Sequence, residues 1–204
     1  HGHPDGTWSL PAGVDDASLE VAPRMSMGEA VDAVRALAPA AAVPHMYCMH
    51  GMTTLRGLLS LLDVPVLGNG PDAMALSTNK WHTRAIMAAA GVPVAEGQLL
   101  RKGELPTMEA PFILKPCRED NSLGISLFKG GSEEELKERV EHALTFDDQV
   151  IAEKFVPLGY EVRVAVVEDE DGEPTIMLPV CNYVLPQSSP IREAQDKLQT
   201  DDRG

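Results

Sequence analysis

One lysine, Lys115, ends a short apolar run and precedes a loop of small and polar residues. The run, residues 110–114, predicts a buried strand whose last side chain emerges into a cleft. A buried ammonium group needs a counter-anion, because an unpaired charge is costly to remove from water. The loop over 117–124 supplies backbone N–H groups, the Asn121 amide and the Ser122 hydroxyl. Together these groups predict a phosphate-binding site.

A second interpretation of the same stretch needs no ligand. A strand over 125–128 follows the loop, so this stretch can be an ordinary β-hairpin with Lys115 extending its charged end into water. The loop also differs from a P-loop, since it lacks the G-x-x-x-x-G-K-[ST] pattern. From these residues alone, both interpretations stay open.

The chain has 204 residues and a net charge of −14 at pH 7. This length is enough to bury a sizeable core in one or two compact units. The negative charge argues against non-specific binding to nucleic acid or to an anionic membrane, because both repel acidic surfaces. An anionic ligand would therefore need a local basic island in this acidic protein.

Neither the cysteines nor the acidic residues predict a metal site or a disulfide framework. The cysteines at 48, 117 and 181 are far apart and form no C-x-x-C pair. The acidic run over 168–171 is typical of a solvated hairpin turn rather than of a cation site. No apolar run approaches the roughly 18 residues that a membrane helix needs. This pattern favours a reducing compartment, and we expect a cytoplasmic protein.

Helix and strand patterns alternate before residue 70. They predict a helix that begins at Ser26 and ends before Pro39, a strand over 41–49, a helix over 55–62 and a strand over 63–68. Such alternation indicates a parallel sheet, in which ligand-binding residues gather after the strands. His50 follows the first of these strands and is a candidate ligand contact; the alternative is a structural histidine. Thr53 or Thr54 is expected to cap the second helix.

A further helix is predicted over 79–90, with Ser77 or Thr78 as its cap and Gly91 after its end. Lys80 lies in the first turn of this helix. A cation at that position opposes the helix dipole, which is unfavourable unless negative charge lies nearby.

The central region predicts a β-β-α-β order. Its elements are strands over 112–115 and 125–128, a helix over 132–145 and a strand over 149–154. Farther along, strands over 161–167 and 175–180 are expected to pair across Asp171-Gly172, because this dipeptide is typical of a type I′ hairpin turn.

Several stretches, which cover about residues 45–198, resemble the D-alanine–D-alanine ligase group of the ATP-grasp superfamily. They follow the order expected of that group: His50-Gly51 with 55–70, then 75–80 with 89–94, then 115–124, then 153–156. The resemblance implies an α/β fold with an α+β ATP-grasp core. It also predicts that the sequence is the middle portion of a longer chain.

The resemblance implies a division into three domains. Residues 1–79 would form an incomplete N-terminal α/β domain with a parallel sheet. Residues 80–153 would form the central β-β-α-β ATP-grasp subdomain. Residues 154–204 would begin a second, truncated ATP-grasp subdomain.

Five residues match positions that surround the ATP phosphates in this group. Lys80 and Lys115 match the two lysines that hold the phosphates, whose negative charge would explain a lysine at both places. Asn121 and Ser122 fall where the family's loop closes over the phosphates. Lys197 matches a lysine on the loop that covers the site.

Five further residues match positions around the nucleoside and the substrate. Glu153 matches the residue that accepts a hydrogen bond from the adenine amino group, and Lys154 and Val156 match residues that present backbone to the base. Glu161 matches the carboxylate that binds ribose. His50 aligns with a histidine near the substrate pocket. No catalytic residue and no metal ligand is assigned within the chain.

The activity that the resemblance implies is ATP-dependent ligation. A carboxylate is phosphorylated to an acyl phosphate, which an amine then attacks; the expected partners are small carboxylates and amines such as amino acids, and a homodimer is consistent with the group. The expected cofactors are ATP and Mg²⁺, with the metal ligands and a Glu-x-Asn motif beyond Gly204. The alternative is a non-catalytic nucleotide- or partner-binding module derived from the same fold. A glutathione-synthetase-like ligase would share the same phosphate residues.

The sequence departs from the family pattern in three places. A Gly-Glu-Asp-Gly insert that should follow His50-Gly51 is missing. Asp120 and Asn121 replace a glycine and the first serine of the phosphate loop. The glutamate that reads the substrate amino group has no counterpart before Ser26. These differences leave the substrate open.

Overall fold

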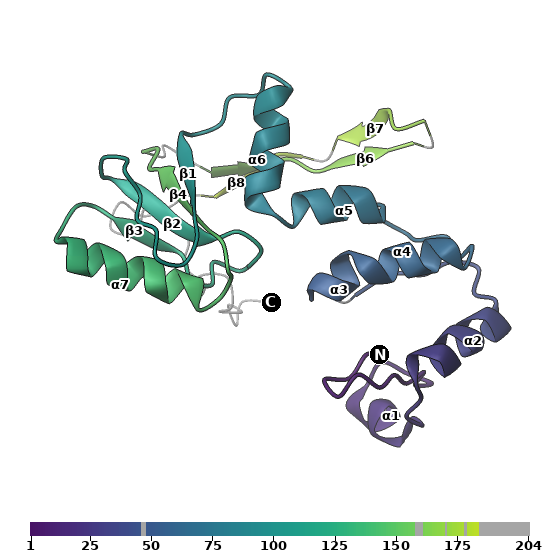
Figure 1. The fold of residues 1–204 in the computed structure, drawn as a ribbon. Helices are drawn as coiled ribbons and strands as arrows, with labels where there is room; N and C mark the ends of the chain where they lie inside the picture. Colours follow the sequence, from purple (N-terminus) through teal and green to yellow (C-terminus); the bar gives the residue numbers. More distant parts are fainter. Residues whose placement is uncertain (46–47, 158–160, 170, 178, 184–204) are drawn as a thin grey trace. The chain divides into compact units, whose positions relative to one another are not determined.

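The computed structural model describes residues 1–45, 48–157, 161–169, 171–177 and 179–183 (Figure 1). The chain forms two compact units, His1–Leu76 and Ser77–Gly204. The three-domain division remains a prediction. Each helix in the described part of the chain is too short or too polar to cross a bilayer.

The described part of the first unit is helical. Its helices are α1 (Asp16–Val21), α2 (Met27–Leu37), α3 (Met49–Met52), α4 (Thr54–Leu61) and most of α5 (Pro71–Ser77). The predicted start of α2 is confirmed, because Ser26 and Glu29 form a reciprocal capping box. Thr53 is the N-cap residue of α4, as predicted, but it makes no side-chain capping bond: its hydroxyl donates instead to the Met49 carbonyl, at 2.6 Å.

Parallel pairing in the described part of this unit is shorter than predicted. It consists of one bridge between Ala42 and Val66. The Ala42 N–H donates to the Pro65 carbonyl at 2.8 Å, and the Leu67 N–H donates to the Ala42 carbonyl at 2.9 Å. Pro44 and Pro65 have no N–H group, so neither can donate to a longer ladder.

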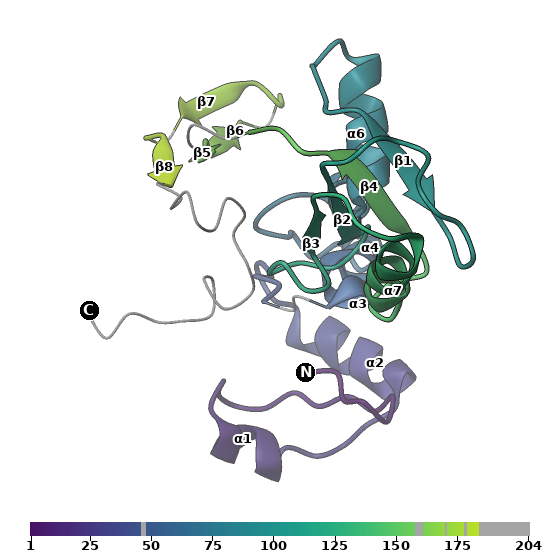
Figure 2. The ribbon, with the colours of Figure 1, turned by 90° about the vertical axis from the view of Figure 1, so that its left-hand side faces the viewer.

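The second unit contains the predicted β-β-α-β order, and one more strand joins the same sheet. Its sheet has the order β1-β4-β2-β3 with every neighbouring pair antiparallel. The strands are β1 (Gly97–Leu100), β2 (Phe112–Pro116), β3 (Ser126–Phe128) and β4 (Val150–Lys154), and helix α7 (Glu133–Leu144) packs against β2 and β4 (Figure 2). This arrangement confirms the α/β fold class.

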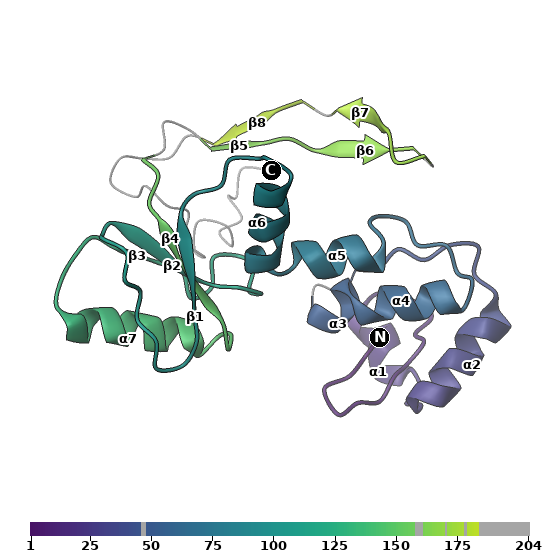
Figure 3. The same cartoon turned by 45° about the horizontal axis from the view of Figure 1, so that its top comes forward.

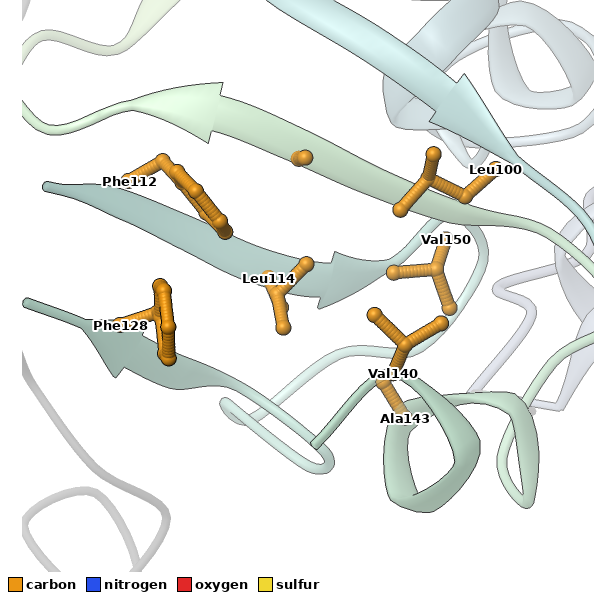
Figure 4. Close-up of a cluster of buried hydrophobic side chains, with 8 residues drawn as sticks. Leu100, Phe112, Leu114, Phe128, Val140, Ala143 and Val150 are labelled. Carbon is orange, nitrogen blue, oxygen red and sulfur yellow. The ribbon is translucent and has the colours of Figure 1, made fainter. Parts of the chain in front are cut away.

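The core of the second unit lies between α7 and one face of the sheet. Eight buried side chains form it: Leu100, Phe112, Leu114, Phe128, Val140, Ala143, Val150 and Ala152 (Figure 4). Strand side chains alternate between faces, so alternate residues of β2 and β4 point into this core. The side chains between them point to the other face of the sheet.

Two short strand pairs follow the sheet in the chain (Figure 3). Strand β5 (Glu161–Arg163) pairs with β8 (Cys181–Tyr183), and β6 (Val166–Glu168) pairs with β7 (Pro174–Met177). The predicted hairpin is therefore present in β6 and β7.

The type I′ turn expected in this hairpin is wrong. Gly172 has a φ of 80°. The Asp169 N–H donates to the Glu173 carbonyl at 3.0 Å, which closes a longer loop. The Asp169 carboxylate accepts from the Asp171 and Glu173 N–H groups, so it stabilises that loop.

Candidate functional site

Lys115 and Glu153 project from the sheet face opposite the core. Lys115 is paired with Ile151 in the β2–β4 register, and Glu153 lies two residues farther along β4, on the same face as Ile151. The alternation that buries Leu114 therefore places a lysine and a glutamate side by side on the other face.

A cavity of about 300 Å³ lies at this face of the second unit. It is lined by Ser77, Lys80, Thr83, Arg84, Met87, Val94, Ala95, Lys115 and Glu153. Three cationic side chains and a single carboxylate are among these residues. In a chain with a net charge of −14, this lining is the basic island that an anionic ligand requires.

The Glu153 carboxylate is shared between two cations. Its Oε1 accepts from Lys115 Nζ at 2.5 Å, and its Oε2 accepts from Arg84 Nη1 at 3.2 Å. The three side chains are only 15–21% exposed. Because solvent screens such partly buried charges incompletely, the cluster fixes all three side chains strongly.

Helix α6 (Lys80–Ala89) brings Lys80 and Arg84 to the cavity. The two residues are four positions apart, so they lie on one face of the helix. The helix is capped by Asn79, which accepts from the Trp81 and His82 N–H groups; the predicted cap at Ser77 or Thr78 is therefore wrong. Arg84 was not predicted from sequence, although its spacing from Lys80 was a usable signal.

Lys80 holds the start of the loop after β2. Its ammonium group donates to the Pro116 carbonyl at 3.0 Å and to the Cys117 carbonyl at 3.5 Å, and also to the Glu119 carbonyl. These carbonyl dipoles provide the negative charge that a lysine in a first helical turn needs. Burial lowers the pKa of Lys80, and the nearby Lys115 charge lowers it further.

The loop over 117–124 is tightly folded, but its tip lies outside the cavity lining. Asn121 and Ser122 have left-handed φ values of 47° and 62°. A serine in this region costs about 1–3 kcal/mol, which is typical of sites where surrounding structure imposes a conformation. Gly124 also has a positive φ, and a Cβ there would lie 2.7 Å from the Phe146 ring and 2.8 Å from Pro116. Glycine therefore serves close packing at this position.

An ion pair fastens the start of this loop to the segment between α7 and β4. The Arg118 side chain donates to Asp147 Oδ1 at 2.7 Å from Nη2, and its backbone N–H donates to Oδ2 at 2.7 Å. The Asp147 side chain is 3% exposed. Burial raises the pKa of Asp147, but the hydrogen bonds from Arg118 outweigh this effect and leave it below its usual value. Sequence reasoning missed Asp147, because its contact depends on the fold.

We expect Cys117 to resist thiol reagents while the protein is folded. Burial raises the pKa of its thiol to about 11, and the neighbouring Asp147 charge adds to this effect. Only about one such thiol in a thousand is ionised at pH 8. Cys48 and Cys181 are exposed, so they should react with a disulfide reagent within minutes, and mass spectrometry of digests identifies the labelled sites. Rapid labelling of Cys117 without denaturant would contradict its burial.

The residues predicted to bind the nucleoside are only partly brought together. Glu153 lines the cavity, whereas Lys154 and Val156 lie outside the lining, at and beyond the end of β4. The Lys154 N–H donates to the Glu96 carbonyl at 2.8 Å. Glu161 begins β5, again outside the lining. Lys197 lies outside the described residues.

His50 belongs to the first unit and lines another cavity, of about 540 Å³, with mostly apolar side chains around it. It is not at a strand end as expected, because it lies in α3. Its Nδ1 lies 3.3 Å from the Thr54 hydroxyl, one helical turn away. This contact fits the structural alternative, and the ligand role of His50 stays a prediction.

Metal-binding side chains do not gather in the described part of the chain. No group of three or more His, Cys, Asp or Glu side chains there could hold an ion.

Half of the chain matches a known protein family. Residues 86–187 match the family described as "D-ala D-ala ligase C-terminus". The D-alanine–D-alanine ligase of Geobacter sulfurreducens is 34% identical over 145 residues, which cover 67% of this chain and 45% of that protein. The corresponding ligase of Halorhodospira halophila is 40% identical over 121 residues, covering 57% and 38%. The chain thus spans less than half the length of these relatives.

A solved structure shares the fold. The D-alanyl-alanine synthetase A of Vibrio cholerae superposes with a TM-score of 0.61 at 22% identity. The superposition covers 72% of this chain and 46% of that protein. At this identity, the likeness bears on the fold alone.

Proposed function

Since the chain belongs to the family of the D-alanine–D-alanine ligase C-terminal domain, we propose that it binds ATP as part of an ATP-dependent carboxylate–amine ligase. The observation that carries this proposal is the cavity in which Lys80, Arg84, Lys115 and Glu153 meet. An excess of cations in an acidic chain favours a polyanion, and a triphosphate is such a ligand.

Lys115 and Lys80 are the proposed phosphate-binding residues. Lys115 already extends into the cavity, and its charge-assisted hydrogen bond to Glu153 can be replaced by one to a phosphate oxygen. Lys80 holds the carbonyl groups of 116, 117 and 119, so it also fixes the base of the loop that carries Asn121 and Ser122. We propose that this loop closes over the phosphates.

The proposed nucleoside contacts lie along β4 and beyond it. Glu153 would accept from the adenine amino group, while Lys154 and Val156 would present backbone to the base. Glu161 would bind the ribose, and Lys197 would cover the site. His50 is proposed near the substrate.

ATP supplies a phosphoryl group that turns a carboxylate into an acyl phosphate, which an amine can attack. The proposed substrates are amino acids, because the relatives named above are D-alanine–D-alanine ligases. Mg²⁺ is proposed from the family alone. The cytoplasm is the proposed compartment, and a homodimer the proposed assembly.

The ribose assignment predicts a selective defect for Glu161→Gln. A carboxylate accepts a hydrogen bond from a hydroxyl more strongly than an amide does, by roughly 1 kcal/mol or about fivefold in affinity. ATP should therefore lose about fivefold in affinity, while 2′,3′-dideoxy-ATP should lose little. Calorimetric titration of both ligands checks this. Equal losses would remove Glu161 from the ribose site.

The ligase proposal is tested by nucleotide turnover of the full-length gene product. ADP release is measured with Mg²⁺ and a panel of D- and L-amino acids, and hydroxylamine is added to trap an acyl phosphate as a hydroxamate. Amino-acid-stimulated ADP release with hydroxamate formation supports the ligase. ATP binding without any stimulated release would favour the non-catalytic module.

A further inference from the structure

Arg84 binds one of the two oxygens of the Glu153 carboxylate, which lines the cavity. Its Nη1 binds Glu153 Oε2 at 3.2 Å, while Lys115 binds Oε1 at 2.5 Å. We expect a bound nucleotide to break the Lys115 contact and to leave the Arg84 contact in place. A phosphate group competes for Lys115, whereas nothing in the proposed function requires Arg84 to leave Glu153.

The position of the Arg84 guanidinium is fixed by its neighbours. It lies over the Trp81 ring, 5.5 Å from the ring centroid. On β1, Gly97 pairs with Glu153 across the sheet, and a Cβ at this position would lie 2.8 Å from Arg84 Nη1. Any side chain at 97 would thus displace the guanidinium. Residues from α6, β1 and β4 together fix its position.

Release of Lys115 would leave Glu153 in a partly buried place, where an unpaired carboxylate is unfavourable. Arg84 removes this cost, because it keeps the Glu153 carboxylate paired and hydrogen-bonded through Oε2. Oε1 is then the free acceptor, facing the cavity that Lys115 shares.

We propose that Arg84 determines the base selectivity of the nucleotide site by holding Glu153 so that Oε1 accepts from the amino group of adenine. Arg84 is a positioning residue in this scheme, since it acts through Glu153. The proposal rests on the proposed ATP binding and adds a specificity determinant to that site. A hypoxanthine base carries a carbonyl group in place of the amino group. Its carbonyl oxygen and the carboxylate are both hydrogen-bond acceptors, so they repel each other.

The test compares ATP with ITP, which differ at this amino group. The wild-type protein should bind ATP more tightly than ITP. In Arg84→Met, ATP affinity should fall about tenfold while ITP affinity changes little, so the ATP/ITP ratio falls about tenfold. Arg84→Lys keeps a charge on a shorter, single donor and should give an intermediate ratio. In an Arg84→Met and Glu153→Gln double variant, the loss should not exceed that of Glu153→Gln alone.

Arg139→Met is the matched control, because Arg139 pairs with Glu135 along the exposed face of α7 and should leave the ratio unchanged. Circular dichroism monitors folding, and Arg84→Gln and Arg84→Lys replace the methionine variant should it not fold. An unchanged ratio in folded Arg84 variants would overturn the proposal, as would equal losses for ATP and ITP, which indicate a general charge effect on the phosphates. A wild-type protein that binds neither nucleotide would instead overturn the proposed function on which this inference depends.

Discussion

Replacing Lys115 with alanine lowers the affinity for ATP by about ten- to a hundredfold and leaves the protein folded. A hydrogen bond between charged groups contributes roughly 1.5–3 kcal/mol, which corresponds to that range of affinity. The fold should tolerate the change, because Glu153 keeps Arg84 as a partner and no carboxylate is left unpaired. Calorimetric titration with ATP gives the affinity, and thermal unfolding checks the fold.

Lys137→Ala is the control for this variant. Lys137 lies on α7, its side chain is 67% exposed, and its nearest carboxylate is Glu141 at 3.9 Å. Its loss removes the same charge from the chain but should leave ATP affinity within twofold, since an exposed pair of this kind contributes little. Unchanged ATP affinity in a folded Lys115→Ala protein would remove Lys115 from the site.

Phe112→Ala should lower the free energy of unfolding of the second unit by about 3–5 kcal/mol. The Phe112 side chain is 1% exposed and packs against Phe128, with ring centroids 5.2 Å apart. Its removal leaves a cavity between the sheet and α7 in addition to the lost apolar burial. Urea denaturation followed by fluorescence and circular dichroism measures the change.

Phe146→Ala is the matched change for this experiment, because it removes the same ring from a side chain that is 37% exposed. It should cost clearly less than Phe112→Ala. Similar losses in the two variants would show that the buried cluster does not dominate the stability of this unit.

The sequence was sufficient for the central elements because their patterns are local. Apolar residues at strand and helix spacing predicted β2, β3, α7 and β4 in order, and a capping box placed the start of α2. The same alternation implied that Lys115 leaves the core face, as it does. A lysine at a strand end and a lysine in a first helical turn both signalled nearby negative charge.

Other features could not be predicted, because they depend on contacts between distant segments. Arg84 meets Glu153 across 69 residues of sequence, and Arg118 meets Asp147 across 29. No local pattern identifies such a pair. The contacts of Lys80 with backbone carbonyl groups were not predicted either, because its expected partner was a ligand. Local signals also compete, as where Asn79 caps α6 in place of the neighbouring Ser77 or Thr78.

Photolabelling with 8-azido-ATP tests most directly whether the cavity of the second unit binds ATP. The labelled protein is digested, and the modified peptides are identified by mass spectrometry with and without competing ATP. Binding in the cavity predicts labelling, suppressed by ATP, in peptides that contain the lining residues of α6, residues 94–95, β2 or β4. Labelling confined to other segments, or labelling that excess ATP does not suppress, would contradict it.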